Sequence, residues 1–245
     1  MISVPDLVAD LCRLGVRADD TVMVHASLRR IGRVEGGAAG VVQALEAAVG
    51  PDGTLLMNIS PSGAEPFDPR QTPCDPELGV LAEIFRQLPG TLVSNHPEGR
   101  FGARGRLAES LISDVPWNDY YGPGSPLQRL VELRGKVLRL GADTNTVTLL
   151  HYAEYLVPLP AKRRVVRYPR VQGPTGPVIR RVECLDDSEG IVDYPGEDYF
   201  SVVLTEYLAT GLASQRMVGS ATSELIDATD LVAFAVNWMS RNLAT

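Results

Sequence analysis

The sequence lacks the features that mark several large classes of protein. Its three cysteines, Cys12, Cys74 and Cys184, are odd in number and far apart, with no CxxC pair. This pattern indicates neither a disulfide framework nor a zinc knuckle, and it favours free thiols in a reducing compartment. No apolar run approaches the roughly 20 residues of a membrane span, and no basic-then-apolar leader precedes the first expected helix. We therefore expect a cytoplasmic protein with no membrane partner.

Motifs of nucleotide-binding and hydrolytic enzymes are absent as well. The sequence contains no GxxxxGK[ST], no GxGxxG between a strand and a helix, no GxSxG and no HExxH. A metal site would have to gather His25, His96 and His151 from distant segments without any ligand spacing, so no metal is expected. The net charge of -7 argues against a nucleic-acid partner and permits a cationic small molecule.

The sequence does contain a repeated alternation of apolar strands and amphipathic helices, which is typical of an α/β domain. The pattern predicts helices over 4–14, 37–49, 79–88, 198–210 and 224–241, and strands over 21–25, 54–58, 91–94, 135–140 and 216–219. Between 161 and 193 it changes to charged and β-branched residues, typical of antiparallel strands with one solvated face. We predict a single domain over residues 1–245 with an antiparallel insertion near 161–193.

Several loops are candidates for a functional site. Residues 60–77 contain five prolines and no periodicity, and loops longer than about 15 residues tend to be functional, so this one is a candidate substrate flap. Three strand ends, VHASLRR at 24–30, VSNHP at 93–97 and LGADTNT at 140–146, carry polar residues where α/β folds bind ligands. Each is also compatible with an ordinary turn. Their association with all three histidines favours the functional interpretation.

His151 lies in a segment whose spacing leaves its role open. On a helix, Thr144, Thr148, His151 and Tyr155 form one polar stripe, while the residues on other faces point to the core: Val147, Leu150, Ala153 and Leu156. This placement is compatible with a catalytic base and with a satisfied core histidine. Glu154, three residues further on, either orients the imidazole or is a solvated charge.

Seven segments, taken in order, resemble the aminoglycoside 3-N-acetyltransferases, which use acetyl-CoA. They are VHASL at 24–28, GTLLM at 53–57, EPFDP at 65–69, HP at 96–97, GSPLQRL at 124–130, GKVLRLG at 135–141 and TVTLLHYAE at 146–154. The resemblance runs from about residue 5 to 240 and is densest over 122–156. It implies a three-layer α/β/α sandwich around a mixed sheet. It also implies that acetyl-CoA, as co-substrate, meets a polycationic aminoglycoside in a cleft.

The resemblance implies roles for individual residues on the catalytic and cofactor sides. His151, in the motif TxxHxxE, resembles the general base that deprotonates the attacking amine, and Thr148 would lie beside the thioester carbonyl. Asp198 is a further catalytic candidate, as a carboxylate near the base. The expected coenzyme A turn comprises His25, Ala26, Ser27, Leu28 and Arg29, and further cofactor-side matches are His96, Ser125 and Pro126.

The acceptor side requires carboxylates, because the acceptor in this family is polycationic. The acidic stretch 193–198 provides Asp193, Glu197 and Asp198, and the long loop provides Glu65 and Asp68. Asp198 is alternatively the cap of the helix that begins there.

Two departures from the family pattern bear on the acceptor. Tyr152 follows His151 where some members have a second histidine, and the region 157–190 is compact. We predict acetyl transfer to an aminoglycoside amine, direct and without a covalent enzyme intermediate, by a monomer or homodimer. Two alternatives stay open: acetylation of a non-antibiotic small amine, and a non-catalytic protein that binds a cationic ligand.

Overall fold

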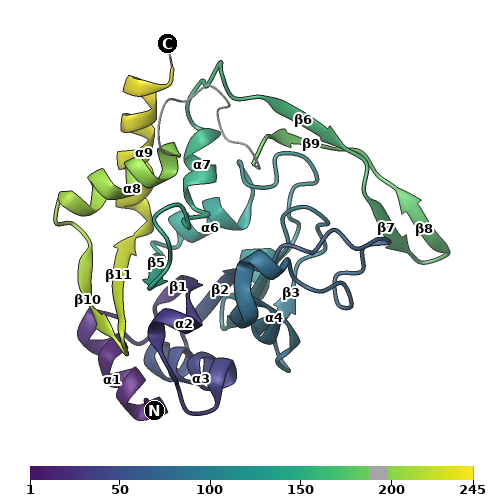
Figure 1. Ribbon diagram of the computed structural model, residues 1–245. Coiled ribbons are helices and arrows are strands. Elements are labelled where there is room, and N and C mark those ends of the chain that lie inside the picture. Colours follow the sequence, from purple (N-terminus) through teal and green to yellow (C-terminus); the bar gives the residue numbers. More distant parts are fainter. Residues whose placement is uncertain (188–197, 245) are drawn as a thin grey trace.

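A seven-stranded sheet forms the centre of the computed structural model, which describes residues 1–187 and 198–244 (Figure 1). The strand order is β10-β11-β5-β1-β2-β4-β3. The strands are β1 (Thr21–Ala26), β2 (Thr54–Asn58), β3 (Leu92–Val93), β4 (Phe101–Gly105), β5 (Lys136–Leu140), β10 (Ser214–Val218) and β11 (Ala221–Asp227). Strand β1 runs parallel to β2 and β5, whereas the other neighbours pair antiparallel. The expected mixed sheet is confirmed.

Helices cover both faces of this sheet because its central strands are apolar on both sides. Val22 and Leu138 contribute to one core cluster, and their neighbours Met23 and Val137 to the other. The first cluster includes side chains of α1 (Val4–Leu14), α2 (Leu28–Ile31), α3 (Gly37–Val49) and α4 (Gly79–Gln87). The second includes α5 (Ala108–Ile112), α6 (Pro126–Glu132), α7 (Leu150–Glu154), α8 (Tyr199–Ala209) and α9 (Ala228–Asn242). The expected three-layer α/β/α sandwich is confirmed.

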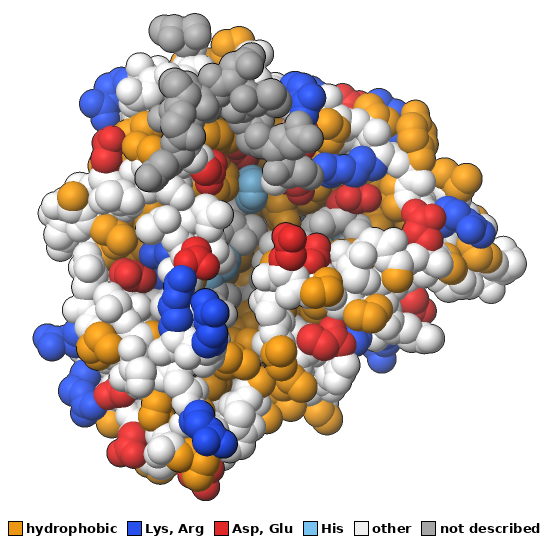
Figure 2. Space-filling view, viewed as in Figure 1, with side chains coloured by type: hydrophobic (Ala, Val, Ile, Leu, Met, Phe, Trp, Pro, Cys, Tyr) orange, Lys and Arg blue, Asp and Glu red, His pale blue; other side chains and the backbone are white. Residues whose placement is uncertain are grey.

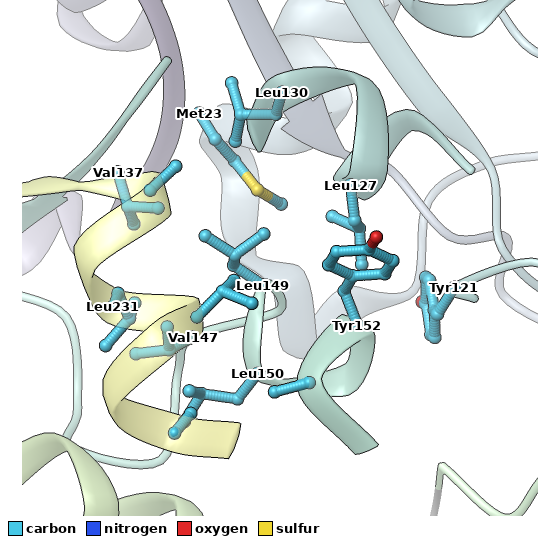
Figure 3. Close-up of a cluster of buried hydrophobic side chains, with 14 of the residues drawn as sticks. Met23, Tyr121, Leu127, Leu130, Val137, Val147, Leu149, Leu150, Tyr152 and Leu231 are labelled. Atoms are coloured by element: carbon cyan, nitrogen blue, oxygen red, sulfur yellow. The ribbon is translucent and has the colours of Figure 1, made fainter. Parts of the chain in front are cut away.

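The second cluster packs the segment around α7 between the sheet and α9. Figure 3 shows Val147, Leu149 and Leu150 pointing toward α9, which contributes Leu231, while Met23 and Val137 approach from the sheet. All six of these side chains are at most 1 % exposed. This packing holds the chain rigidly on both sides of the functional candidates Thr148 and His151.

Two antiparallel strand pairs project from the sheet as an arm, visible at the right of Figure 1. They are β6 (Arg164–Arg167) with β9 (Val182–Leu185), and β7 (Arg170–Gly173) with β8 (Gly176–Ile179). They lie within the range 161–193 where the sequence alternates. A bridge from Phe67 to Val171 joins the arm to the long loop that precedes the short helix η1 (Pro76–Leu78).

The expected C-terminal helix begins later than its apolar spacing suggests. Residues 224–227 belong to β11, where Leu225 pairs with Leu138 and Ile226 with Val137 of β5. The side chain of Asp227 then accepts hydrogen bonds from the first amides of α9. Pairing with a central strand buries these apolar side chains, so tertiary structure overrides the helical period.

The segment after β5 is not one long helix with a period of 3.6 residues. The prediction that Thr144, Thr148, His151 and Tyr155 form one helical stripe was therefore wrong. Only Leu150–Glu154 is helical, and hydrogen bonds between residues three apart wind the chain tightly, including those from His151 N to Thr148 O and from Tyr152 N to Leu149 O. At three residues per turn Thr148 and His151 align, and Glu154, three residues further along α7, lies within hydrogen-bond distance of His151. Leu156, expected in the core, is 44 % exposed.

The described residues contain no helix long and apolar enough to cross a membrane.

Candidate active site

A cleft of about 680 Å³ opens where β1 and β5 end. Because these neighbouring strands are parallel, with Ala26 opposite Leu140, the turns that follow them lie side by side. Ser27 N donates to Leu140 O over 2.9 Å and ties the two turns together. Figure 2 shows the hollow down the middle of this face, with histidine side chains in it and charged side chains along its rims. The lining includes residues 24–29, 57–58, 77–82, 142–143, 145–148, His151, Asp187 and Phe200.

Arginines fix the turn after β5 that forms one wall of the cleft. The buried Arg139 donates to the carbonyls of Ala142 and Asp143 over 3.0 and 2.6 Å, and it pairs with Glu224 at 3.1 Å. Arg30 donates to the carbonyl of Gly141 over 2.8 Å. Gly141 has φ +61°, and a Cβ there would meet Ala221 and Arg30 at 2.9 Å. The wall is therefore held from behind by charge-assisted hydrogen bonds.

His151 and Glu154 form a hydrogen-bonded pair at the side of the cleft. His151 Nδ1 lies 2.8 Å from Glu154 Oε2, and the imidazole is 17 % exposed whereas the carboxylate is 1 % exposed. The ring stacks on Tyr121 with centroids 5.0 Å apart and meets the edge of Phe200 at 4.8 Å. These contacts hold the imidazole plane, and they leave Nε2 as the ring nitrogen available to a ligand.

The second oxygen of Glu154 faces a buried cation. Lys162 Nζ lies 2.7 Å from Glu154 Oε1 and donates to the hydroxyl of Tyr199 over 3.1 Å, while that hydroxyl donates to the same Oε1. Burial raises the pKa of the Glu154 carboxyl, but the hydrogen bonds and charges of His151 and Lys162 outweigh it and hold this pKa below its ordinary value. The carboxylate is thus ionised, although it is withdrawn from water.

His25 occupies the end of β1 beneath the cleft. Burial, together with the charge of Arg139, lowers its pKa to about 3, so its imidazole is neutral near pH 7. Its Nε2 is buried and has no hydrogen-bond partner among the described residues. A buried polar atom of this kind is costly unless it is paired, so a ligand in the cleft is the partner that its position suggests.

The structure brings one part of the expected site together. His25, Ala26, Ser27, Leu28 and Arg29, expected to bind the cofactor, all line the cleft, as do the catalytic candidates Thr148 and His151. They come from two segments more than a hundred residues apart, which the parallel pairing of β1 and β5 places next to each other.

The other cofactor-side candidates lie elsewhere. Both ring nitrogens of the buried His96 are engaged, since Nε2 lies 3.0 Å from Trp117 O and Nδ1 accepts from Gly99 N over 2.9 Å. Burial also lowers the pKa of His96 to about 4. Ser125 is the buried N-cap of α6, and Pro126 is the first residue of that helix. These three residues support the fold, and the lining of the cleft does not include them.

Of the expected acceptor-side carboxylates, Glu65, Asp68 and Asp198 are not among the residues that line the cleft. Glu65 accepts from Arg170 N over 3.1 Å, and Asp68 accepts from Arg70 N and Gln71 N within its own turn. Asp198 is exposed and stands at the N-cap position of α8, but its side chain makes no capping hydrogen bond to the described residues. The expected Asp193 and Glu197 lie outside the described residues.

Several residues at the site were not predicted from the sequence. Lys162 is the first residue of a charged segment whose pattern predicts a solvent-exposed strand, yet Lys162 is buried. Tyr121 and Tyr199 come from loops and helices far from His151 in sequence. Asp187 and Glu77, which were not predicted, provide acidic side chains to the lining. The local sequence offers one signal that Lys162 is buried, which is that it follows a run of apolar and proline residues.

The described residues, 1–187 and 198–244, contain no group of three or more histidine, cysteine, aspartate or glutamate side chains that could hold a metal ion.

Known proteins resemble this chain over nearly its whole length. The sequence model of the family described as aminoglycoside 3-N-acetyltransferase matches residues 23–240. Aminoglycoside N(3)-acetyltransferase III of Serratia marcescens is 38% identical, covering 99% of this chain and 98% of its own. A solved structure described as AAC-IIIb binary with CoASH superposes with TM-score 0.95 at 38% identity, covering 99% and 98%. Another, AAC-VIa bound to sisomicin, superposes with TM-score 0.93 at 35% identity, covering 99% of each chain.

The fold, the cleft and these similarities together define an N-acetyltransferase. More specifically, the chain belongs to the aminoglycoside 3-N-acetyltransferase family.

Proposed function

We propose that this enzyme transfers the acetyl group of acetyl-CoA to an amino group of an aminoglycoside, specifically the 3-amino group, with His151 as general base. The observation that carries the proposal is the cleft itself, in which the coenzyme A turn and His151 face one space. Its volume of about 680 Å³ falls within the range of roughly 300–1,000 Å³ usual for small-molecule sites. The biological role that follows is antibiotic resistance.

The proposed reaction is a direct transfer. The amine nitrogen attacks the thioester carbonyl carbon, an N–C bond forms and the C–S bond breaks. Nε2 of His151 accepts the proton that the amine loses, and this proton leaves on the thiol of coenzyme A. A protonated amine cannot attack, so a neutral imidazole is the suitable base. Thr148 also lines the cleft, and in the proposed reaction its hydroxyl donates to the developing oxyanion.

The residues of the first turn suit coenzyme A. Arg29 lines the cleft and is exposed, so its guanidinium can meet the pyrophosphate, which arginine binds with paired hydrogen bonds. His25 Nε2, buried and without a partner among the described residues, is a polar atom that a pantetheine amide can satisfy. Arg29 would thus provide a charged contact to coenzyme A, and His25 a neutral one, from the same turn.

Acidic residues of the lining suit a polycationic acceptor. Glu77 and Asp187 line the cleft, together with Asp143, which pairs with Arg30. The net charge of -7 has the same sign and raises the local concentration of a cation.

Replacing Arg29 with glutamine is expected to raise the KM for acetyl-CoA about 10- to 100-fold while kcat changes little, since one charge-assisted contact is worth roughly 1.5–3 kcal/mol. Initial rates at varied acetyl-CoA and saturating aminoglycoside measure both constants. Arg33→Gln is the matched control, because Arg33 is exposed nearby but is not part of the lining. An equal KM in the R29Q and R33Q proteins would contradict the assignment of this turn.

The proposed function is tested by thiol release from acetyl-CoA in the presence of a panel of aminoglycosides, with the acetylated position read by NMR. We expect turnover with at least one member and acetylation at the 3-amino group. Turnover only with small non-antibiotic amines would assign the alternative substrate class. Thermal stabilisation by aminoglycosides without thiol release would identify a binding protein instead.

A further inference from the structure

The chain uses lysine very sparingly. Of its 23 basic residues only two are lysines, Lys136 and Lys162, and the other 21 are arginines. Lys136 lies at the start of β5, at the opposite end of the strand from the cleft, and pairs with Asp20 at 2.7 Å. Lys162 pairs with Glu154 in the interior. Both lysines therefore form an ion pair with a carboxylate: that of Lys162 is buried beside the proposed base, and that of Lys136 is partly exposed and remote from it.

Lys162 is withdrawn from water almost completely. Its side chain is 1 % exposed, as is that of Glu154, and its ammonium is 5.7 Å from the centre of the Tyr199 ring. An ion pair buried to this degree costs desolvation, and replacing it with apolar residues is often neutral or stabilising. Stability alone is therefore a weak explanation for a lysine at this position. Its contact with Glu154, which in turn contacts His151, suggests a role in the reaction.

The ionised state of Glu154 decides which nitrogen of His151 carries the proton. An ionised carboxylate only accepts hydrogen bonds, so opposite Oε2 the Nδ1 atom must be the donor and Nε2 keeps its lone pair. One added proton removes that lone pair in either arrangement. It can sit on the imidazole, giving an imidazolium, or on Glu154, which then donates to Nδ1 and forces the proton onto Nε2. The base functions only when the pair holds a single proton.

We propose that Lys162 is a positioning residue for acetyl transfer, whose ammonium keeps Glu154 ionised and turned toward His151, so that Nε2 of His151 stays free to accept a proton. The inference rests on the proposed function of His151 as the base. Without the ammonium, the pair would carry an uncompensated negative charge in a dry environment and would take up a proton at higher pH.

Other groups around the pair do not replace this charge. Tyr199 from α8 and Tyr121 face Glu154 and His151, and burial raises the pKa of both phenols, so each is neutral. Asp187 in the lining of the cleft acts electrostatically on Tyr121, and Asp198 acts on Tyr199; both are acidic, so neither replaces the ammonium. Among the described groups that contact the pair, Lys162 is the cation.

The test compares the pH profiles of kcat/KM for the wild type, Lys162→Met and Lys136→Met. In K162M the acid limb is expected to move to higher pH by about 1–3 units, the usual effect of one nearby charge, and to converge with the wild type on the alkaline side. K136M removes a lysine from an ion pair remote from the cleft, so its profile should match the wild type. Lys162→Gln, which keeps a hydrogen-bond donor but no charge, carries the same comparison if K162M does not fold.

Three results would overturn the proposal. They are an unshifted acid limb in a folded Lys162 variant, an activity lowered equally at every pH, and an equal shift in K136M. A wild type that releases no thiol would instead contradict the proposed function, which is a different outcome.

A spectroscopic measurement tests Lys162 without any substrate. The chain has three histidines, so ¹⁵N spectra of labelled protein can resolve the ring nitrogens of His151. In the wild type near neutral pH, Nδ1 should carry the proton and Nε2 should not. In K162M or K162Q, Nε2 should be protonated at the same pH. A protonated Nε2 in the wild type, or the same tautomer in wild type and variant, would rule out the proposed role.

Discussion

Replacing His151 with alanine is expected to lower kcat/KM for acetyl transfer by about 10²–10⁴-fold, the usual contribution of a general base. His151 presents Nε2 to the cleft while Nδ1 is engaged by Glu154. Without it, water must remove the amine proton. Steady-state rates of thiol release at saturating acetyl-CoA measure the effect.

Binding of coenzyme A separates loss of the base from loss of the fold. The H151A protein should bind coenzyme A nearly as tightly as the wild type in calorimetry, since the proposed cofactor turn at 25–29 is contributed by a different segment. Turnover within a factor of about three of the wild type, far short of the usual effect of a base, would exclude His151 from the chemistry.

Replacing Glu154 with glutamine is the second large effect that we expect, a loss of kcat/KM of at least about 10²-fold; the corresponding change in a Ser–His–Asp enzyme costs about 10⁴-fold through the wrong tautomer. The amide can donate to Nδ1 of His151 and leave the proton on Nε2. KM values should change little, because Glu154 is 1 % exposed and cannot reach a substrate.

The control for this change is Glu132→Gln, an exposed glutamate on α6 whose replacement removes the same charge. Its rates should equal those of the wild type. Melting temperatures belong in the comparison, since E154Q leaves the buried ammonium of Lys162 beside a neutral amide. Equal activity of E154Q and the wild type would show that the carboxylate only supports the fold.

Local patterns predicted the fold well where they coincide with the contacts that stabilise it. The helix over residues 4–14 has Leu7 and Leu11 on its buried face, and Ser3 at its N-cap accepts from Asp6 N. The strand over 54–58 is buried as its apolar run suggests. Both rest on interactions between residues close in sequence, which a periodicity records directly.

The patterns were misleading where distant partners decide the local structure. Residues 224–227 have apolar positions compatible with a helix, but pairing with β5 makes them a strand. The turn from Asp143 to Leu149 is held by Arg139 and by packing against α9, so it winds more tightly than a helix of period 3.6. Neither the strand partner nor Arg139 can be inferred from the segment itself.

The same distinction applies to the site. The sequence alone determined an alternation of strands and helices typical of an α/β domain, because that pattern depends on residues near one another along the chain. Its resemblance to a known family added the three-layer sandwich and the motif with Thr148, His151 and Glu154 at a spacing of three. Only the tertiary structure decided that His25 and His151 share one cleft, that His96 does not, and that Glu154 pairs with Lys162. Those outcomes depend on strand order and on which charges are buried together, and a buried charge persists only beside a partner that the fold delivers.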